Sequence, residues 1–165
     1  MPSELARNFL GFRLGSVEYA VHVSLVKGVL RPQAVSEVPR MPDGVLGVVY
    51  LRGDVVPVVD LRRLLRLGPL PSGTAPKWIL VNGPPTPAPD GSPRPTRQSG
   101  AFVLVVDTVS GVFGASIADE RPAPEMLAAS DVPKILFVTK REDALVFTLD
   151  LSAISAHLPE LPPLP

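Results

Sequence analysis

The sequence predicts an all-β protein with short helices, arranged as two small barrels of about five strands each. Three observations lead to this fold class. Short valine-rich segments with a period of two residues recur along the chain, sustained helical periodicity is absent, and one strand-and-helix pattern occurs twice. Each half is too small for confident stability alone, so we expect the two barrels to pack on each other.

The strand candidates are short apolar runs bounded by glycine, proline or polar residues. They cover residues 9–14, 18–23, 46–51, 55–59, 77–81, 101–106, 111–117, 135–139 and 144–149. Gly15 and Gly53 lie between neighbouring candidates, where tight hairpin turns favour glycine. Pro57 has no amide hydrogen to donate to a ladder and indicates an edge or a bulge.

The repeated pattern consists of a strand, an aspartate, a leucine and a short amphipathic helix. Its two copies read VVPVVDLRRLL at residues 55–65 and LVFTLDLSAIS at residues 145–155. Asp60 and Asp150 are each expected to cap the N-terminus of the helix that follows. We expect four side chains of these helices to be buried against the barrels or between them: Leu61, Leu64, Leu151 and Ile154.

A chain of 165 residues with 45% hydrophobic residues can bury a core within one domain. Its two halves predict approximate subdomains at residues 15–75 and 76–150, with the N-terminal strand and the C-terminal helix crossing between them. Residues 83–99 contain six prolines and almost no large apolar side chains, so they are expected to form a flexible insertion.

Composition excludes several classes of function. The formal net charge is zero, which gives no electrostatic basis for binding nucleic acid or an anionic membrane surface. Cysteine is absent and histidine occurs only twice, so disulfides, thiol nucleophiles and metal sites are not expected. No secretory signal is visible at the N-terminus, and the apolar runs are far shorter than a membrane helix. We therefore expect a cytoplasmic protein without metal or cofactor.

The residues that most often carry chemistry have simpler interpretations here. His22 lies in a predicted strand and is expected to face solvent, and His157 ends a helix, where a cation interacts favourably with the helix dipole. Asp60 and Asp150 are interpreted as caps rather than an acid–base pair, and Asp107 as an ordinary turn residue. No nucleophile and base occur together, so the sequence predicts a protein that is not an enzyme and acts through its surfaces.

The segment GVVYLRGDVVPVVDLRRLL at residues 47–65 resembles the signature of the CheW family of bacterial chemotaxis coupling proteins. FRLGSVEYAVHVSLVKGV at residues 12–29 is similar to that family's first hairpin and short helix. VVDTVSGVF at residues 105–113 and RPAPE at residues 121–125 are similar to its second half. Because the likeness covers nearly the whole chain, it implies that residues 1–165 form a single CheW-like domain of two SH3-like five-stranded barrels.

The resemblance implies a non-catalytic adaptor that couples chemoreceptors to a CheA-type histidine kinase in a bacterial chemosensory signalling array. The implied partners are the cytoplasmic tip of a chemoreceptor and the regulatory domain of the kinase, with other CheW-like proteins as further candidates. Such arrays form at membrane-bound or cytoplasmic receptors, and neither nucleic acid nor direct membrane insertion is implied. The alternative is an accessory CheW-like module that binds only one partner and modulates kinase output.

The resemblance also implies which residues contact the partners. The implied receptor-binding residues, in a groove between the barrels, are Val23, Val26, Val29 and Arg52. The implied kinase-binding residues are Leu46, Gly47, Gly53, Val109 and Val112. Apolar valines beside a turn glycine suit such contacts, because they lose little hydration when a partner covers them. The alternative for each valine is a place in the core.

Two positions depart from the family's pattern. Tyr50 stands where the signature has asparagine, and Gly28 stands where the family has an acidic residue in the short helix after the second strand. The acidic partner usual for Arg52 is therefore missing, so this arginine must meet a carboxylate on a partner or stay solvated.

Overall fold

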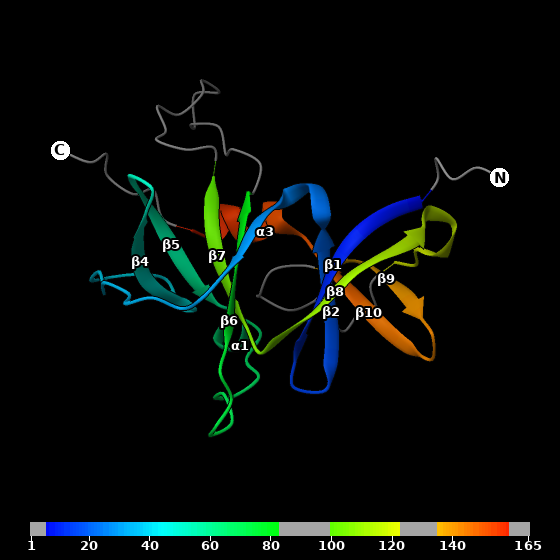
Figure 1. Cartoon of the computed structure of the whole chain (residues 1–165), viewed down its shortest axis with the longest axis horizontal. Coiled ribbons are helices and arrows are strands. Elements are labelled where there is room, and N and C mark those ends of the chain that lie inside the picture. The colour runs from blue at the N-terminus through cyan, green and yellow to red at the C-terminus, as the bar shows by residue number, and fades with distance from the viewer. Residues whose placement is uncertain (1–5, 83–99, 123–134, 159–165) are drawn as a thin grey trace.

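The computed structural model describes residues 6–82, 100–122 and 135–158 and contains two five-stranded sheets with short helices (Figure 1). In hydrogen-bonded order, the first sheet consists of β3 (Val26–Leu30), β6 (Lys77–Asn82), β7 (Ala101–Val106), β5 (Asp54–Asp60) and β4 (Val45–Leu51). The second consists of β8 (Thr108–Ser116), β1 (Ala6–Leu14), β2 (Val17–His22), β10 (Ala144–Leu149) and β9 (Ile135–Arg141). The helices are α1 (Leu61–Leu64) and α3 (Leu151–His157), with 3-10 turns η2 (Val23–Leu25) and η3 (Ile117–Asp119). The predicted fold class is confirmed, and residues 83–99 lie outside the described residues.

Each sheet closes into a barrel through one backbone bridge. In the first sheet Ser36, which follows edge strand β3, exchanges hydrogen bonds of 2.8 and 2.9 Å with Val48 of the opposite edge strand β4. In the second sheet Arg121, which follows β8 and η3, exchanges bonds of 2.9 and 2.8 Å with Val138 of β9. The two closures occupy equivalent places, so the two barrels share one design.

The chain crosses between the barrels twice. β2 of the second barrel leads through η2 to β3 of the first, and β7 of the first barrel leads to β8 of the second. The first barrel is therefore built from β3 to β7, whereas the second combines β1 and β2 with β8, β9 and β10. This division differs from the expected subdomains at 15–75 and 76–150, because β6 and β7 pair with β3 and β5. Long-range pairing of this kind leaves no local mark in the sequence.

The sequence repeat is confirmed as a structural repeat. β5 runs parallel to β7 and leads to α1, and β10 runs parallel to β2 and leads to α3. Asp60 Oδ1 accepts a 3.0 Å hydrogen bond from the Arg62 amide, and Asp150 Oδ1 accepts one of 3.2 Å from the Ala153 amide. Both predicted caps are therefore present.

The largest apolar core lies between the two barrels. One face of β1 and β2 and one face of β6 and β7 meet there, with Phe12 and Ile79 fully buried. The four helix side chains predicted to be buried all belong to this core and are at most 4% exposed: Leu61, Leu64, Leu151 and Ile154. Each barrel also has a small interior core, which contains Trp78 in the first barrel and Phe9 in the second.

Strand β3 is absent from the predicted set. The resemblance implied a short helix around Gly28, whereas the helical turn η2 ends at Leu25 and Gly28 lies inside β3, opposite Leu80 of β6. The residues of β3 are half-buried or exposed, so their apolar pattern is weak. The strand forms because β6, which lies far along the chain, supplies its hydrogen-bonding partners.

His22 also differs from its prediction. Its ring packs with its centroid 4.7 Å from that of Phe9 and 6.4 Å from that of Phe137, at one end of the second barrel's interior, rather than facing solvent. Burial, and then the positive charge of Arg7, lower the pKa of His22 below its ordinary value, and Glu120 acts in the opposite direction.

Candidate binding surfaces

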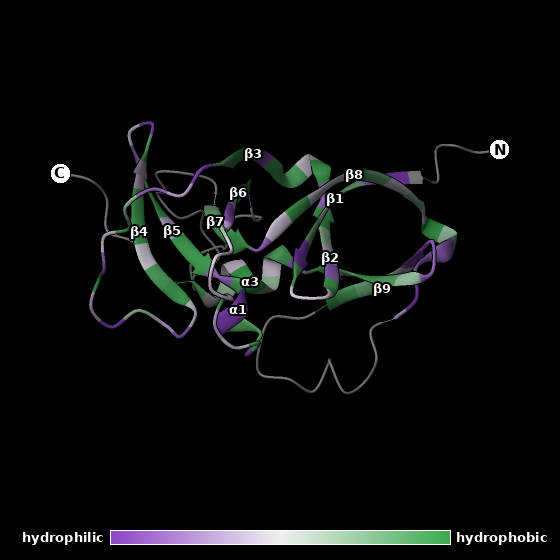
Figure 2. Cartoon of the chain, turned by 60° about the horizontal axis from the view of Figure 1, so that its bottom comes forward, coloured by the Kyte–Doolittle hydropathy of each residue, from purple (hydrophilic) through white to green (hydrophobic). Residues whose placement is uncertain are grey.

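β3 and β8 are the edge strands that follow the two crossovers, and they lie along the same side of the molecule (Figure 2). In β3, Val26 pairs with Val81 and Val29 pairs with Ile79. Both partners belong to the core between the barrels, and directly paired residues point to the same face of a sheet. A register shift between Val26 and Gly28 allows this at a spacing of three residues. Val26 and Val29 therefore share the face that looks toward the other barrel.

β8 has the same arrangement. Val109 pairs with Phe12 and Val112 pairs with Leu10, and both partners belong to the core between the barrels. The pairing again shifts between the two valines, next to Gly111 with its φ of 113°. Val109 and Val112 therefore share the inter-barrel face of their own sheet.

These equivalent residues of the two crossing strands form what we call the valine face: Val26, Val29, Val109 and Val112. The inner valine of each strand packs against the core, whereas Val29 is 49% exposed and Val112 is 60% exposed. Val23 in η2, just before β3, is 36% exposed. The resemblance assigned the two strands to different partners, and the structure shows that their valines occupy equivalent positions.

Arg52 and Gly53 form the tip of the β4–β5 hairpin. Their φ values of 49° and 87° are both left-handed, as a two-residue hairpin turn of type I′ requires. Both residues are exposed, and Figure 1 shows the hairpin tip apart from β3. Arg52 therefore belongs to a different part of the surface from the valines with which the resemblance groups it.

Leu46 and Gly47 have structural roles in β4. Leu46 packs against the interior core of the first barrel. Gly47 is buried, has a φ of 149°, and lies against the bridge that closes the barrel. A Cβ atom at this position would come 2.2 Å from the carbonyl oxygen of Ser36, so a side chain would block the closure.

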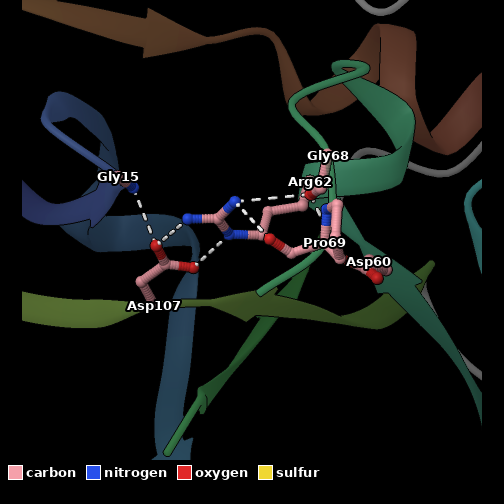
Figure 3. A network of polar contacts seen from close by, with 6 residues as sticks. All are labelled: Gly15, Asp60, Arg62, Gly68, Pro69 and Asp107. Atoms are coloured by element: carbon pink, nitrogen blue, oxygen red, sulfur yellow. Dashed lines mark hydrogen bonds and ion pairs between the residues drawn. The ribbon is translucent and has the colours of Figure 1, made fainter. Parts of the chain in front are cut away.

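A buried ion pair is the feature of the site that sequence reasoning missed (Figure 3). Arg62 Nη2 donates to Asp107 Oδ2 at 2.6 Å and Arg62 Nε donates to Asp107 Oδ1 at 2.7 Å, with both side chains 10% exposed. Asp107 Oδ2 also accepts a 2.7 Å hydrogen bond from the Gly15 amide. Arg62 Nη1 donates to the carbonyl oxygens of Gly68 and Pro69 at 3.3 and 3.1 Å. Interpreting Asp107 as an ordinary turn residue was therefore wrong.

The two partners keep each other charged. The hydrogen bond from Arg62 lowers the pKa of the Asp107 carboxyl below its ordinary value and outweighs the opposing effect of burial. The same hydrogen bond raises the pKa of Arg62. Both residues stand inside segments that resemble the family, DLR and VVDTVSGVF, but their pairing across 45 residues is not visible in either segment.

The described residues 6–82, 100–122 and 135–158 hold neither a cluster of metal ligands nor a membrane-spanning helix. Among these residues, no three or more His, Cys, Asp or Glu side chains are grouped as metal ligands would be. Within the same ranges, none of the helices is long and apolar enough to cross a membrane.

Comparison with known proteins agrees with the fold. The chain matches the CheW-like domain over residues 8–158. It is 28% identical over 153 residues to the chemotaxis protein CheW of Helicobacter pylori, covering 92% of this chain and 83% of that protein. It is 32% identical over 120 residues to the protein FrzA of Myxococcus xanthus, covering 72% of this chain and 65% of that protein.

A solved structure has the same fold. The scaffolding protein TtCheW from Thermoanaerobacter tengcongensis matches with a TM-score of 0.69 at 19% identity, covering 87% of this chain and 88% of that chain. The matched range of residues 8–158 includes both barrels, both crossovers and the repeated strand-and-helix units. The chain therefore belongs to the CheW-like domain family.

Proposed function

We propose that this protein is a non-catalytic adaptor that couples chemoreceptors to a CheA-type histidine kinase in a bacterial chemosensory array. The observation that carries the proposal is the match to the CheW-like domain across residues 8–158. The names of similar proteins support it, since they include chemotaxis proteins named CheW and a structure described as a scaffolding protein. The adaptor acts in the cytoplasm, where the kinase and the receptor tips are accessible.

The surfaces follow from this function. The exposed valines lie on a rigid two-barrel frame, and valine has few rotamers to lose on binding, so contact with an apolar partner costs little conformational entropy. The receptor tip contacts the β3 side of the molecule and the exposed hairpin arginine: Val23, Val26, Val29 and Arg52. The regulatory domain of the kinase contacts β8 and the exposed tip of the β4–β5 hairpin: Gly53, Val109 and Val112. Leu46 and Gly47 act there by holding the shape of β4.

Separate titrations of a purified receptor tip and a purified kinase regulatory domain test the proposal. Val29→Asp is expected to weaken receptor binding about tenfold or more, because a carboxylate in an apolar contact loses its hydration without gaining a partner. Val112→Asp is expected to weaken kinase binding by a similar factor for the same reason. The matched control is Leu136→Asp, which adds the same charge at an exposed apolar position of β9 outside the valine face. Circular dichroism must first show that each variant is folded.

The outcomes separate the alternatives. A wild-type protein that binds neither partner contradicts the adaptor function, and one that binds only a single partner is the accessory module instead. If Val29→Asp and Val112→Asp weaken the same partner, the whole valine face serves that partner and the division of surfaces proposed above is wrong.

A further inference from the structure

We propose that Arg62 and Asp107 are positioning residues that fix the orientation of the two barrels relative to each other, and that the binding surfaces of the adaptor depend on this orientation. The second half of the proposal rests on the proposed adaptor function. The first half concerns the free protein and stands without it.

The ion pair joins the barrels at a crossover. Asp107 is the single residue between β7 of the first barrel and β8 of the second. It is attached to the first hairpin of the second barrel, because its amide donates to the Arg13 carbonyl at 3.1 Å and its carboxylate accepts from the Gly15 amide. Arg62 belongs to α1, which follows β5 of the first barrel. The pair therefore connects the two barrels beside the backbone crossover.

The geometry of this contact is directional. The guanidinium of Arg62 binds Asp107 through two parallel hydrogen bonds, and the carbonyl oxygens of Gly68 and Pro69 hold its remaining edge. Apolar attraction within the core between the barrels is non-directional, so it does not select one relative rotation as a forked pair of hydrogen bonds does. Apolar residues often replace a buried ion pair without loss of stability, so stability alone does not explain why the pair is present.

The repeat supplies an internal comparison. The two copies share the capping aspartate and the buried leucine, but the next residue is Arg62 in the first copy and Ser152 in the second. The Ser152 side chain is exposed, and α3 is nevertheless capped and buried. A strand-and-helix unit of this design forms without the arginine, which indicates that Arg62 has a role beyond its own unit.

The test compares the wild type with the double variant Arg62→Met/Asp107→Leu, which keeps an apolar filling and removes the directional contact. The chain has no cysteine, so spin labels attach only where one is introduced. Labels at Lys77→Cys in β6 and Lys140→Cys in β9 measure the distance between the barrels. Labels at Lys77→Cys and Tyr50→Cys measure a distance within the first barrel and are the control. All three positions are exposed.

The double variant is expected to keep its Tm within about 4 °C of the wild type. Its distance distribution between the barrels is expected to broaden or shift, whereas the distribution within the first barrel stays unchanged. Arg62→Lys, which keeps the charge and loses the fork, is expected to give an intermediate broadening. The double variant is also expected to bind the kinase regulatory domain about tenfold more weakly, although Val109 and Val112 are intact.

An unchanged distance between the barrels in the double variant overturns the proposal, and so does equal broadening of both distributions. Altered orientation with wild-type affinity for both partners overturns its second half. If the double variant does not fold, Arg62→Lys decides in its place, because it loses the fork and keeps the charge, and an unchanged distribution there overturns the proposal. A wild-type protein that binds neither partner contradicts the adaptor function, while the distance measurement still decides the positioning role.

Discussion

Gly47 and Gly28 both lie in strands, yet only one of them needs to be glycine. The Cβ of any other residue at position 47 would meet the Ser36 carbonyl oxygen in the bridge that closes the first barrel. A Cβ at position 28 would meet no atom within 4 Å, and the φ of Gly28 is not left-handed. Close approach of two backbone segments therefore explains one glycine of the family signature.

Gly47→Ala is expected to lower the free energy of unfolding by about 2 kcal/mol or more, because the Cβ displaces the bridge and the backbone conformation is strained. The control Gly28→Ala is expected to change it by less than about 1 kcal/mol. Urea unfolding of the two variants measures both values. Similar losses at the two positions would count against the closure argument.

Leu64→Ala is expected to lower the free energy of unfolding by about 2–5 kcal/mol, because Leu64 is buried in the core between the barrels. Leu67→Ala removes the same atoms from an exposed side chain and is expected to change it by less than about 0.5 kcal/mol. The same urea experiment measures both, and a stable Leu64→Ala variant would contradict the position of α1.

His22 predicts a dependence of stability on pH. Because burial and Arg7 lower the pKa of His22 in the folded protein, the unfolded chain binds a proton more readily. The contribution of His22 to stability is therefore complete above the unfolded pKa of about 6.5 and is lost as the pH falls toward the folded pKa. As the pH falls from about 7.5 to about 5.5, the His22→Gln variant is expected to lose less stability than the wild type. Thermal unfolding at several pH values measures both proteins. If the Tm values of the wild type and His22→Gln change with pH in parallel, His22 does not contribute to the pH dependence of stability.

Local sequence patterns predicted some residues well and others not at all. The caps at Asp60 and Asp150 depend only on the residues that follow each aspartate, so the sequence was sufficient. The environments of Asp107 and His22 depend on side chains brought from distant positions, such as Arg62 and Phe137. No local pattern contains that information.

At the scale of elements, register shifts decide which residues share a surface. In a regular strand, residues three positions apart point to opposite faces. Val109 and Val112 share a face only because the β1–β8 pairing shifts between them, and the same holds for Val26 and Val29 in β3. The sequence predicted most strands from their apolar alternation, but these shifts depend on the pairing partner. The valine face was therefore not predictable from period-two patterning.

The cap of α3 can be tested with two substitutions at Asp150. Asp150→Ala is expected to lower the free energy of unfolding by about 1 kcal/mol, because the Ala153 amide loses its acceptor. Asp150→Ser keeps an acceptor oxygen and is expected to recover most of that loss. Thermal and urea unfolding measure the difference, and equal stability of the alanine and serine variants would show that the cap does not contribute.

At the scale of the molecule, the barrels share one core, and the first barrel is inserted in the chain between β2 and β8 of the second. Cooperative unfolding of both barrels is the expected consequence. The single tryptophan, Trp78, lies in the interior of the first barrel and reports on that barrel. A second protein, Trp78→Phe/Phe137→Trp, moves the reporter to the interior of the second barrel.

The fluorescence transitions of these two proteins are expected each to coincide with the transition seen by far-ultraviolet circular dichroism. If the Trp78 fluorescence transition has a different urea midpoint from the circular dichroism transition, the two barrels unfold as independent units. The sequence predicted two packed halves from the repeat and from the small size of each half. It also predicted that the N-terminal strand and the C-terminal helix cross between the halves, but it did not predict the insertion of one barrel within the other, because the repeat marks equivalent units without stating which strands pair.

The two crossovers also have a mechanical meaning. A partner that pulls on one barrel strains covalent backbone links into the other, through η2 at one crossover and through Asp107 at the other. Two separately folded barrels joined by a single tether would separate under such a load once their side-chain contacts yielded. In this chain the first barrel is joined to the second at both of its ends, so a pull on either barrel is transmitted along peptide bonds as well as across the packed interface.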